Sequence, residues 1–271
     1  MSSGHSAGKI AVLCYHAIAD HRDDPVLSEY SVRPARFRRH LRVLRWFGYR
    51  YVDADAALAV LAGQRAPARR CVLLTFDDGY ENFADVVHAE LVRKGAPAVV
   101  FVVAGLLGKT NEWDQRDGAR PLRLLSSEQL HKLERDGVEI GAHSMTHADL
   151  SDLDPTALDR EVTLCADILE EKQLRRPRLY SYPFGASPDA AQVCARNAGY
   201  SAAFALQSSL LDHRSDPFAL PRIRVSSRDG ALRLLRRIDD PRVAPLVRRL
   251  HSAVRILTSI AHSGRRTSPT E

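Results

Sequence analysis

Two adjacent carboxylates, Asp77 and Asp78, stand directly before Gly79 at the end of an apolar run, residues 71–76. An apolar run of this length, bounded by turn residues, is typical of a buried strand. Two carboxylates at a strand end suit a metal site in which one binds the cation and the other acts as a base. Asp-Asp-Gly is also a common polar turn, so the motif alone leaves both interpretations open.

Two histidines, His143 and His147, follow a second strand-like run, residues 138–142. Histidines four positions apart can face one metal ion if the turn after the strand is helical. The alternative is a pair of surface histidines in a chain that has 11. Because two separate strand ends each deliver ligand-type side chains, we favour a catalytic site for a divalent metal, with zinc ahead of cobalt, nickel or manganese.

Two weaker signals lie at further strand ends. Proline and glycine bracket Phe184 in the segment 180–185, which predicts a fixed turn with exposed backbone N–H groups. Such an N–H can stabilise an oxyanion, although the pattern by itself indicates only a turn. His16 follows the first apolar run, residues 10–14. A lone histidine there is more often structural, but its place on the same predicted rim favours a role in the site.

Strand-like and helix-like segments alternate along the chain, which predicts a mainly parallel sheet with helices outside it. The predicted strands are 10–14, 71–76, 98–103, 138–142, 178–182 and 200–206, and the predicted helices are 35–47, 82–94, 126–136, 154–172 and 190–197. About seven such units in 271 residues favour a closed or nearly closed (β/α) barrel, with an open doubly wound sheet as the alternative. The glycine-rich nucleotide-binding motifs that often follow a strand are missing.

The chain divides into four predicted parts. We expect a disordered N-terminus (1–9), a barrel domain (10–228), a basic amphipathic helical segment (229–262) and a disordered tail (263–271). The helical segment is predicted to pack on the barrel, and peripheral membrane contact through residues 241–262 is the alternative. Within the barrel, a polar insertion at 108–123 contains Trp113 and is expected to form a loop over the strand ends.

The composition is that of an ordinary globular protein, with 45% hydrophobic and 27% charged residues. The net charge of +6 comes with arginines that are not interleaved with aromatic residues, which argues against nucleic-acid binding. The four cysteines include no C-x-x-C pair, so the chain does not require an oxidising compartment. Neither a signal peptide nor a membrane-spanning run is recognisable, and we expect a cytoplasmic protein.

With these residues identified, the chain resembles the polysaccharide deacetylase family, also called carbohydrate esterase family four. The resemblance runs from about Ile10 to Val225. Thr-Phe-Asp-Asp-Gly at 75–79 matches the first family motif, His-Ser-Met-Thr-His at 143–147 matches the second, and Ser-Tyr-Pro-Phe-Gly at 181–185 matches the third in part. The family fold is an irregular seven-stranded (β/α) barrel, which agrees with the count of units and would here carry a C-terminal amphipathic helix.

The resemblance implies roles for the candidate residues. Asp77 would be the general base, and Asp78, His143 and His147 would hold the metal. The backbone N–H of Phe184 and the metal would stabilise the oxyanion formed when water attacks an N-acetyl amide on a sugar. Two aromatic residues, Tyr182 and Trp113, are the expected further contacts to the carbohydrate.

The chain departs from the family pattern in its third motif. Ser181 stands where the family usually carries an arginine that orients the base, and the later family motifs are not evident. Tyr15-His16, Trp113 and the segment 220–225 instead resemble the branch that includes the biofilm poly-N-acetylglucosamine deacetylases. In that branch the early histidine lies in the active site, so His16 is the candidate general acid. We hypothesise that Arg222 supplies the missing guanidinium to the base.

Several functions are compatible with this pattern. The leading one is a metal-dependent hydrolase that removes an N-acetyl or other acyl group from an amino sugar in a glycan, a lipid-linked sugar or a sugar-bearing metabolite. Removal of an acyl or formyl group from a lipid-linked sugar at the inner membrane face is a close alternative, favoured by the basic terminal segment. A catalytically silent glycan-binding protein of the same fold is the alternative from another class, and it predicts the loss of a ligand or of the base.

Overall fold

A computed structural model describes residues 9–66 and 68–238 of the chain. Within these residues eight strands form one sheet, in which every strand pair is parallel. The strands are β1 (Ile10–Tyr15), β2 (Arg50–Tyr51), β3 (Cys71–Phe76), β4 (Ala98–Val102), β5 (Glu139–Ala142), β6 (Leu179–Ser181), β7 (Ala202–Phe204) and β8 (Ile223–Arg224). Seven of them follow the order β7-β6-β5-β4-β3-β1-β8, and β2 pairs with the first residues of β3.

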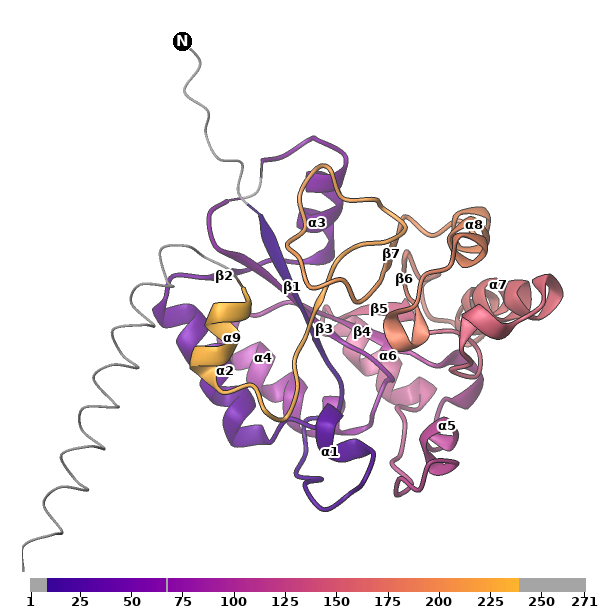
Figure 1. Ribbon diagram of the computed structural model, residues 1–271, viewed down its shortest axis with the longest axis horizontal. Coiled ribbons are helices and arrows are strands. Elements are labelled where there is room, and N and C mark those ends of the chain that lie inside the picture. The colour runs from indigo at the N-terminus through magenta and orange to yellow at the C-terminus, as the bar shows by residue number, and fades with distance from the viewer. Residues whose placement is uncertain (1–8, 67, 239–271) are drawn as a thin grey trace, which may run out of the picture.

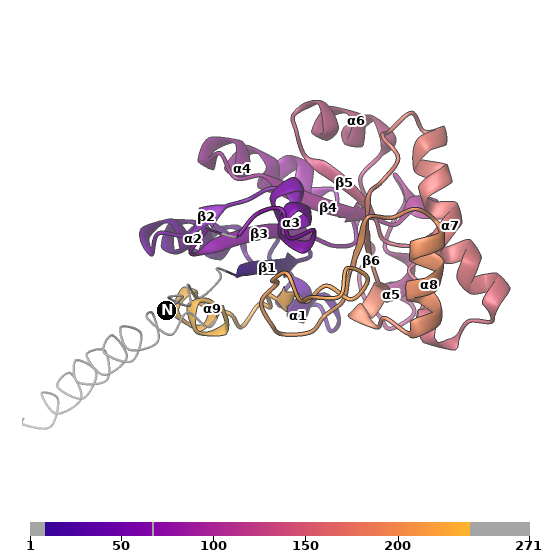
Figure 2. The same cartoon turned by 90° about the horizontal axis from the view of Figure 1, so that it is seen from above.

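Helices surround this sheet, as Figures 1 and 2 show. They are α1 (Leu27–Tyr30), α2 (Pro34–Trp46), α3 (Ala54–Leu61), α4 (His88–Lys94), α5 (Glu112–Gln115), α6 (Ser127–Arg135), α7 (Pro155–Glu171), α8 (Asp189–Asn197) and α9 (Ala231–Arg237). The short helices α1 and α5 belong to loops at the carboxyl ends of the strands, towards the bottom of Figure 1. The insertion predicted as a loop therefore contains one helical turn.

The predicted helix boundaries are confirmed where local signals mark them. Ser126 caps α6 in a capping box with Gln129, and the Asp154 side chain accepts from two backbone N–H groups at the start of α7. Gly95 ends α4 in the left-handed conformation, with φ of 57°. The helix predicted over 82–94 begins instead with a π-helical turn, Phe83–Val87, before α4.

One segment brings the two edges of the sheet together and nearly closes the barrel. Leu220 exchanges two backbone hydrogen bonds of 2.9 Å with Ala203 and Ala205 on the β7 side. Three residues later, β8 pairs with β1 at Leu13 and Cys14. The seven-stranded barrel fold is confirmed, and the open doubly wound alternative is excluded because the chain between 220 and 224 links both edge strands.

The interior of the barrel is apolar at one end and polar at the other. The apolar part is a single cluster of buried side chains from the strands and from α3: Ile10, Val12, Ala57, Val60, Leu73, Val99, Phe101, Leu179, Phe204 and Leu220. Side chains alternate along a strand, so Thr75 lies two residues beyond Leu73 on the same face, and Ser181 lies two residues beyond Leu179. Polar groups are thereby brought to the carboxyl end, where the loops converge.

The last described helix, α9, belongs to the barrel core. Leu234 and Leu235 are buried in the main hydrophobic cluster, which also contains residues of α2. The segment predicted at 229–262 thus begins as part of the packed domain. Its remainder, the tail at 263–271 and residues 1–8 lie outside the described residues. No helix within the described ranges is long and apolar enough to cross a membrane.

Candidate active site

The backbone at the end of β3 explains how two neighbouring carboxylates reach one site. Asp77 continues the alternation of β3 and points into the barrel, while Asp78 adopts a left-handed conformation with φ of 72°. This turn brings the second carboxylate to the same rim. Gly79 follows with φ of 68°, and a Cβ there would lie 2.9 Å from Cγ1 of Val102, so the close approach to β4 requires glycine.

The two histidines meet through an irregular turn, so they face one site without the helical turn that their spacing suggested as the route. Ser144 and His147 both have left-handed backbone conformations, with φ of 65° and 63°. The Ser144 hydroxyl accepts from the backbone N–H of His147 at 2.9 Å, which closes the turn. Left-handed residues that are not glycine carry strain, and such residues concentrate at functional sites.

Asp78, His143 and His147 form a compact group of ligand atoms. Nε2 of each histidine lies 3.3 Å from Oδ1 of Asp78, and all three side chains are buried. The candidate ligand atoms lie within 4.8 Å of one another. A carboxylate and two imidazoles with room for a further ligand are the donor set of a catalytic zinc site.

The hydrogen bonds around this group fit a bound cation. Nδ1 of His143 lies 2.7 Å from the carbonyl oxygen of Ser181, so Nδ1–H donates and the lone pair on Nε2 faces Asp78. Among the described residues, buried Oδ1 of Asp78 has no hydrogen-bond partner of good geometry. Lone pairs that converge on a carboxylate oxygen repel each other unless a cation lies between them, so these residues fit a divalent metal.

Asp77 is held by a guanidinium from the far end of the chain. Nη1 and Nη2 of Arg222 donate to Oδ1 and Oδ2 of Asp77 at 2.7 and 2.8 Å. Nη2 also donates to the Ser181 hydroxyl at 2.8 Å, and that hydroxyl lies 3.2 Å from Oδ2 of Asp77. The contact that the sequence suggested between Arg222 and the base is present, as a fully buried two-pronged ion pair.

This pairing determines the charge of the carboxylate. Burial raises the pKa of Asp77, but the positive charge of Arg222 and the neighbouring His143 outweigh it and lower the pKa to about 2. Asp77 is therefore ionised at neutral pH and able to accept a proton. Burial also raises the pKa of Asp78, but the neighbouring imidazoles of His143 and His147 outweigh this effect, so its pKa lies well below the usual value.

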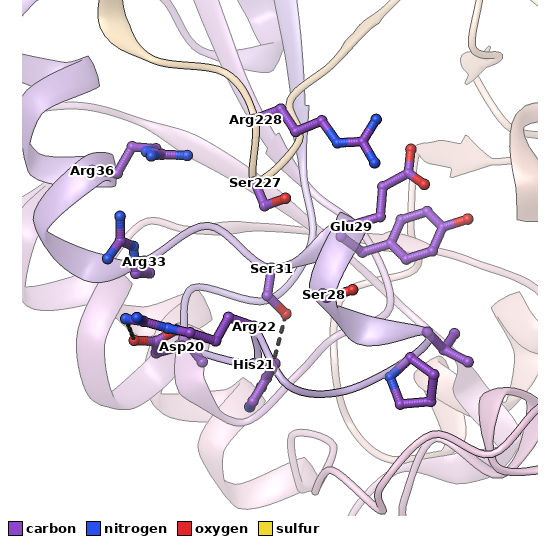
Figure 3. Close-up of a pocket in the computed structure, with 14 residues that line it drawn as sticks. Asp20, His21, Arg22, Ser28, Glu29, Ser31, Arg33, Arg36, Ser227 and Arg228 are labelled. Carbon is purple, nitrogen blue, oxygen red and sulfur yellow. Dashed lines mark hydrogen bonds and ion pairs between the residues drawn. The ribbon is translucent and has the colours of Figure 1, made fainter.

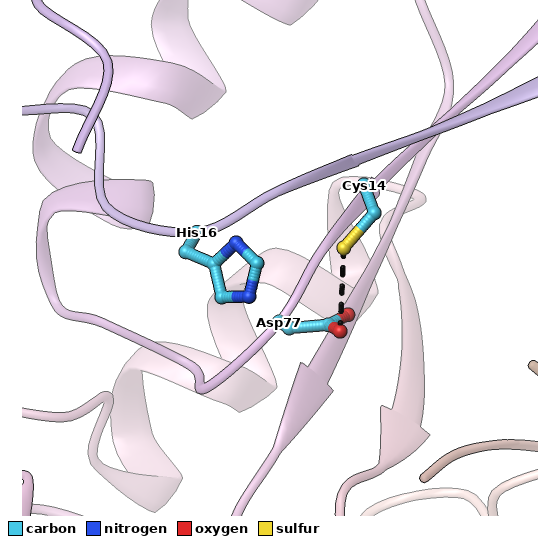
Figure 4. A group of neighbouring side chains, drawn as sticks. All are labelled: Cys14, His16 and Asp77. Atoms are coloured by element: carbon cyan, nitrogen blue, oxygen red, sulfur yellow. Dashed lines mark hydrogen bonds between the residues drawn. The ribbon is translucent and has the colours of Figure 1, made fainter. Parts of the chain in front are cut away.

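Cys14 of β1 and His16, which directly follows β1, lie beside Asp77 (Figure 4). The Cys14 thiol donates to Oδ2 of Asp77 at 3.4 Å. Burial lowers the pKa of His16, which the carboxylates of Asp78 and Asp77 oppose. Nδ1 of His16 has no hydrogen-bond partner among the described residues, and the ring packs against Tyr30 at 5.4 Å between centroids.

Two aromatic side chains enclose His147. The Trp113 ring stacks on the imidazole at 4.4 Å between centroids, and Phe184 meets it edge-on at 4.8 Å. Phe184 has a left-handed backbone, with φ of 57°, and leaves 58% of its surface exposed. Trp113, an expected contact to the carbohydrate, and Phe184, the expected oxyanion residue, therefore both lie at the metal-ligand group.

Tyr182 does not lie where the sequence suggested, and its assignment to the substrate is corrected. Its side chain is fully buried, packs edge-on against Tyr180, and donates from Oη to the carbonyl oxygen of Phe218 at 2.9 Å. A side chain that alternates with Ser181 along β6 faces the helices when Ser181 faces the site. Its hydroxyl is therefore satisfied inside the core.

Sequence reasoning missed Glu161 of α7, which supports the histidine turn. One carboxylate oxygen of Glu161 accepts from the backbone N–H groups of Met145 and Thr146 at 3.0 and 2.9 Å. The other accepts from the Thr146 hydroxyl at 2.7 Å. A glutamate in the middle of an amphipathic helix carries no local signal of such a contact, because its partners, Met145 and Thr146, lie 16 and 15 residues earlier in the sequence.

A family model described as polysaccharide deacetylase matches residues 64–203, just over half of the 271 residues. The chain belongs to the polysaccharide deacetylase family. It is accordingly a carbohydrate deacetylase, an enzyme class that hydrolyses amide bonds. The match contains Asp77, Asp78, His143 and His147, whereas His16 and Arg222 lie outside it.

The curated relatives have low sequence identity to this chain. YxkH of Bacillus subtilis (strain 168), named as a polysaccharide deacetylase, is 25% identical over 219 residues, which cover 80% of this chain and 72% of that protein. The poly-beta-1,6-N-acetyl-D-glucosamine N-deacetylase of Staphylococcus aureus (strain MRSA252) is 22% identical over 222 residues, covering 79% and 73%.

Solved structures share the fold. IcaB from Ammonifex degensii superposes with a TM-score of 0.73 at 24% identity, covering 85% of this chain and 97% of that one. Streptococcus pyogenes deacetylase PplD in complex with acetate gives a TM-score of 0.73 at 22% identity, covering 86% and 100%. The deacetylase barrel is thus common to all three chains.

Proposed function

We propose that this protein removes the N-acetyl group of an amino sugar by metal-dependent hydrolysis, with release of acetate. The observation that carries the proposal is the arrangement around Asp78, where two imidazole Nε2 atoms lie 3.3 Å from one carboxylate oxygen beside an ionised Asp77. A metal-ligand group next to a base is the arrangement that amide hydrolysis by water requires.

Asp78, His143 and His147 would hold the metal. A divalent cation bound there would supply Lewis-acid chemistry, polarising the amide carbonyl and making a water more acidic. Zinc is the proposed ion, with cobalt, nickel and manganese as alternatives, because a mixed carboxylate and imidazole set accepts each of them.

The remaining steps fall to side chains of this chain. Asp77 accepts a proton from the attacking water, and Arg222 keeps that carboxylate ionised and oriented. The backbone N–H of Phe184 stabilises the developing oxyanion. Burial lowers the pKa of His16, so its imidazole can take over the proton that Asp77 accepted from the water and pass it to the leaving amine as the carbon–nitrogen bond breaks.

The substrate side of the site is aromatic. Trp113 and Phe184 flank His147, and the exposed Phe184 ring offers an apolar surface to the C–H face of a sugar. The Staphylococcus aureus relative is named for poly-beta-1,6-N-acetyl-D-glucosamine, so we propose an N-acetylglucosamine-containing carbohydrate as the substrate class. A silent binding protein is disfavoured because the base keeps a buried guanidinium partner that carbohydrate binding alone does not need.

The test is a mass-spectrometric screen of N-acetylated sugars, from free monosaccharide to polymer and lipid-linked oligosaccharide, with added Zn²⁺ or Co²⁺. We expect at least one of them to lose an acetyl group, and chelation of the metal to stop the loss. A protein loaded with metal that binds such sugars without altering any of them would support the silent binding protein instead.

A further inference from the structure

A depression lies at the carboxyl ends of β1 and β8, on the rim of the barrel to which His16 belongs. It holds about 650 Å³ and is formed by the loop after β1, the start of α2 and the loop after β8. Figure 3 shows it with Arg33 and Arg36 on one side and Arg228 across from them. None of its lining residues belongs to the group of Asp78, His143 and His147.

The carboxylates that line this depression are already neutralised. Asp20 accepts from Nη2 of Arg22 at 2.6 Å. Glu29 accepts from Nη2 of Arg224 at 3.0 Å. These pairs leave Arg33, Arg36 and Arg228 as a surplus of positive charge around one concave surface.

Among the described residues, the three remaining arginines form no ion pair with a carboxylate, and Asp20, whose charge Arg33 senses, is already paired with Arg22. Arg33 is the N-cap residue of α2, and Arg36 lies in the first turn of that helix, which contains no acidic residue. The positive end of the α2 dipole adds to their charge. Like charges gathered without a counter-ion repel one another, so an anion placed between them would relieve that repulsion.

The depression adjoins the proposed catalytic groups through Tyr30. This residue lines the depression, and its ring packs against His16 at 5.4 Å between centroids. The guanidinium of Arg224 lies over the same ring at 5.5 Å. A ligand seated against Tyr30 can therefore extend from the arginines towards His16.

We propose that Arg33, Arg36 and Arg228 bind a phosphoryl group, and that this group belongs to the amino-sugar substrate. Guanidinium groups match the geometry of phosphate oxygens, and several guanidinium groups together with a helix N-terminus suit a doubly charged anion better than a single carboxylate. The inference deepens the proposed deacetylase function, because it assigns a phosphorylated amino sugar, joined as a phosphate or diphosphate ester, as the substrate class.

Binding is tested first, without reference to activity. Titration calorimetry with pyrophosphate at fixed ionic strength compares the full-length protein with the triple variant Arg33→Gln/Arg36→Gln/Arg228→Gln. The variant is expected to bind roughly tenfold or more weakly, since each charged hydrogen bond contributes about that much. A control variant, Arg42→Gln/Arg135→Gln/Arg160→Gln, removes the same charge from exposed positions outside the depression and should bind as the original protein does. Equal weakening in both variants, or no binding by the original protein, would overturn the site.

The source of the phosphoryl group is tested by kinetics. We expect kcat/KM for N-acetylglucosamine 1-phosphate to exceed that for N-acetylglucosamine. In the triple variant the KM for the phosphorylated sugar should rise and this preference should shrink, whereas the control variant should keep it. Pyrophosphate binding without any substrate preference would overturn the assignment to the substrate and leave free phosphate as the ligand. If neither sugar releases acetate while pyrophosphate binding still separates the two variants, the proposed function fails and the anion site stands.

Discussion

The base carboxylate and its guanidinium are 145 residues apart in the sequence. The family pattern places an arginine at position 181, where this chain has serine. The small Ser181 side chain leaves space that Arg222 fills from the segment after β7, and the serine hydroxyl accepts from the same guanidinium. The chemical requirement, a guanidinium that binds both oxygens of the base, is thus met from the residue that precedes β8.

Replacing Arg222 tests whether this residue orients the base and keeps it charged, as the arginine of the family pattern does. In Arg222→Met the burial of Asp77 loses its largest offset, so the pKa of that carboxylate rises and its ionised fraction falls at acidic pH. We expect kcat/KM to fall by about a hundredfold, since small displacements of a catalytic group cost that much. The acidic limb of the pH–rate profile should move to higher pH.

Two variants control for the loss of a paired arginine. Arg222→Lys keeps the charge without the fork and should give an intermediate rate. Arg178→Met breaks an equally two-pronged pair, with Glu139, at the start of β5 and β6, and should leave the profile in place. An unchanged acidic limb in Arg222→Met would show that the guanidinium does not set the charge of Asp77.

At the scale of elements, α7 determines the shape of the histidine turn. The turn has two left-handed residues, and Glu161 is the carboxylate that fixes its exposed N–H groups. The position of α7 therefore supports the turn that carries the metal ligands His143 and His147, although α7 contributes no ligand itself. This dependence could not be predicted from the sequence, because it joins a loop to a helix face through backbone groups that all residues share.

The Glu161→Gln variant should weaken metal binding. An amide lacks the negative charge that strengthens the hydrogen bonds from the two backbone N–H groups, and its NH2 cannot accept from the Thr146 hydroxyl as the second carboxylate oxygen does. Loss of an outer support of this kind lowers metal affinity by roughly ten- to a hundredfold. Competition with a chelator measures the zinc Kd, and Glu170→Gln on the same helix is the matched control. Equal zinc affinity in both variants would remove the role assigned to Glu161.

His40 joins three elements and makes their packing sensitive to pH. Its Nε2–H donates to the carbonyl oxygen of Asp229 at 2.7 Å, and Nδ1 accepts from the Tyr15 hydroxyl at 3.1 Å, so the neutral form satisfies both partners. Burial lowers its pKa from 6.5 to about 4. The unfolded chain therefore binds a proton that the folded chain does not, in the window between those values.

Stability should fall as the pH falls through that window. The sign follows from the lowered pKa, and the slope is about 1.4 kcal/mol per pH unit between the two pKa values. His40→Gln can keep both hydrogen bonds but does not titrate, so its free energy of unfolding should depend less on pH by that amount. Chemical denaturation at several pH values measures the difference, and parallel curves for the two proteins would contradict the account.

At the scale of the whole molecule, the barrel could be predicted from alternation but its closure could not. Apolar runs such as residues 71–76 marked the central strands, and the Asp-Asp and His-x-x-x-His motifs marked the metal-ligand group. The strand β8 has only two residues and directly follows Pro221 and Arg222, so no periodicity revealed it. The assignment of Tyr182 to the substrate was wrong because a sequence motif identifies neighbouring residues but does not indicate which face of the strand each side chain occupies.

The central claim is that a metal held by Asp78, His143 and His147 and a base at Asp77 together hydrolyse an N-acetylated sugar. The most direct measurement is bound zinc and acetate release determined on the same samples of the original protein, Asp77→Asn and His143→Ala. The account predicts an equimolar zinc content with acetate release for the original protein, retained zinc without release for Asp77→Asn, and loss of both for His143→Ala. Acetate release by metal-free protein, or undiminished release by Asp77→Asn, would contradict it.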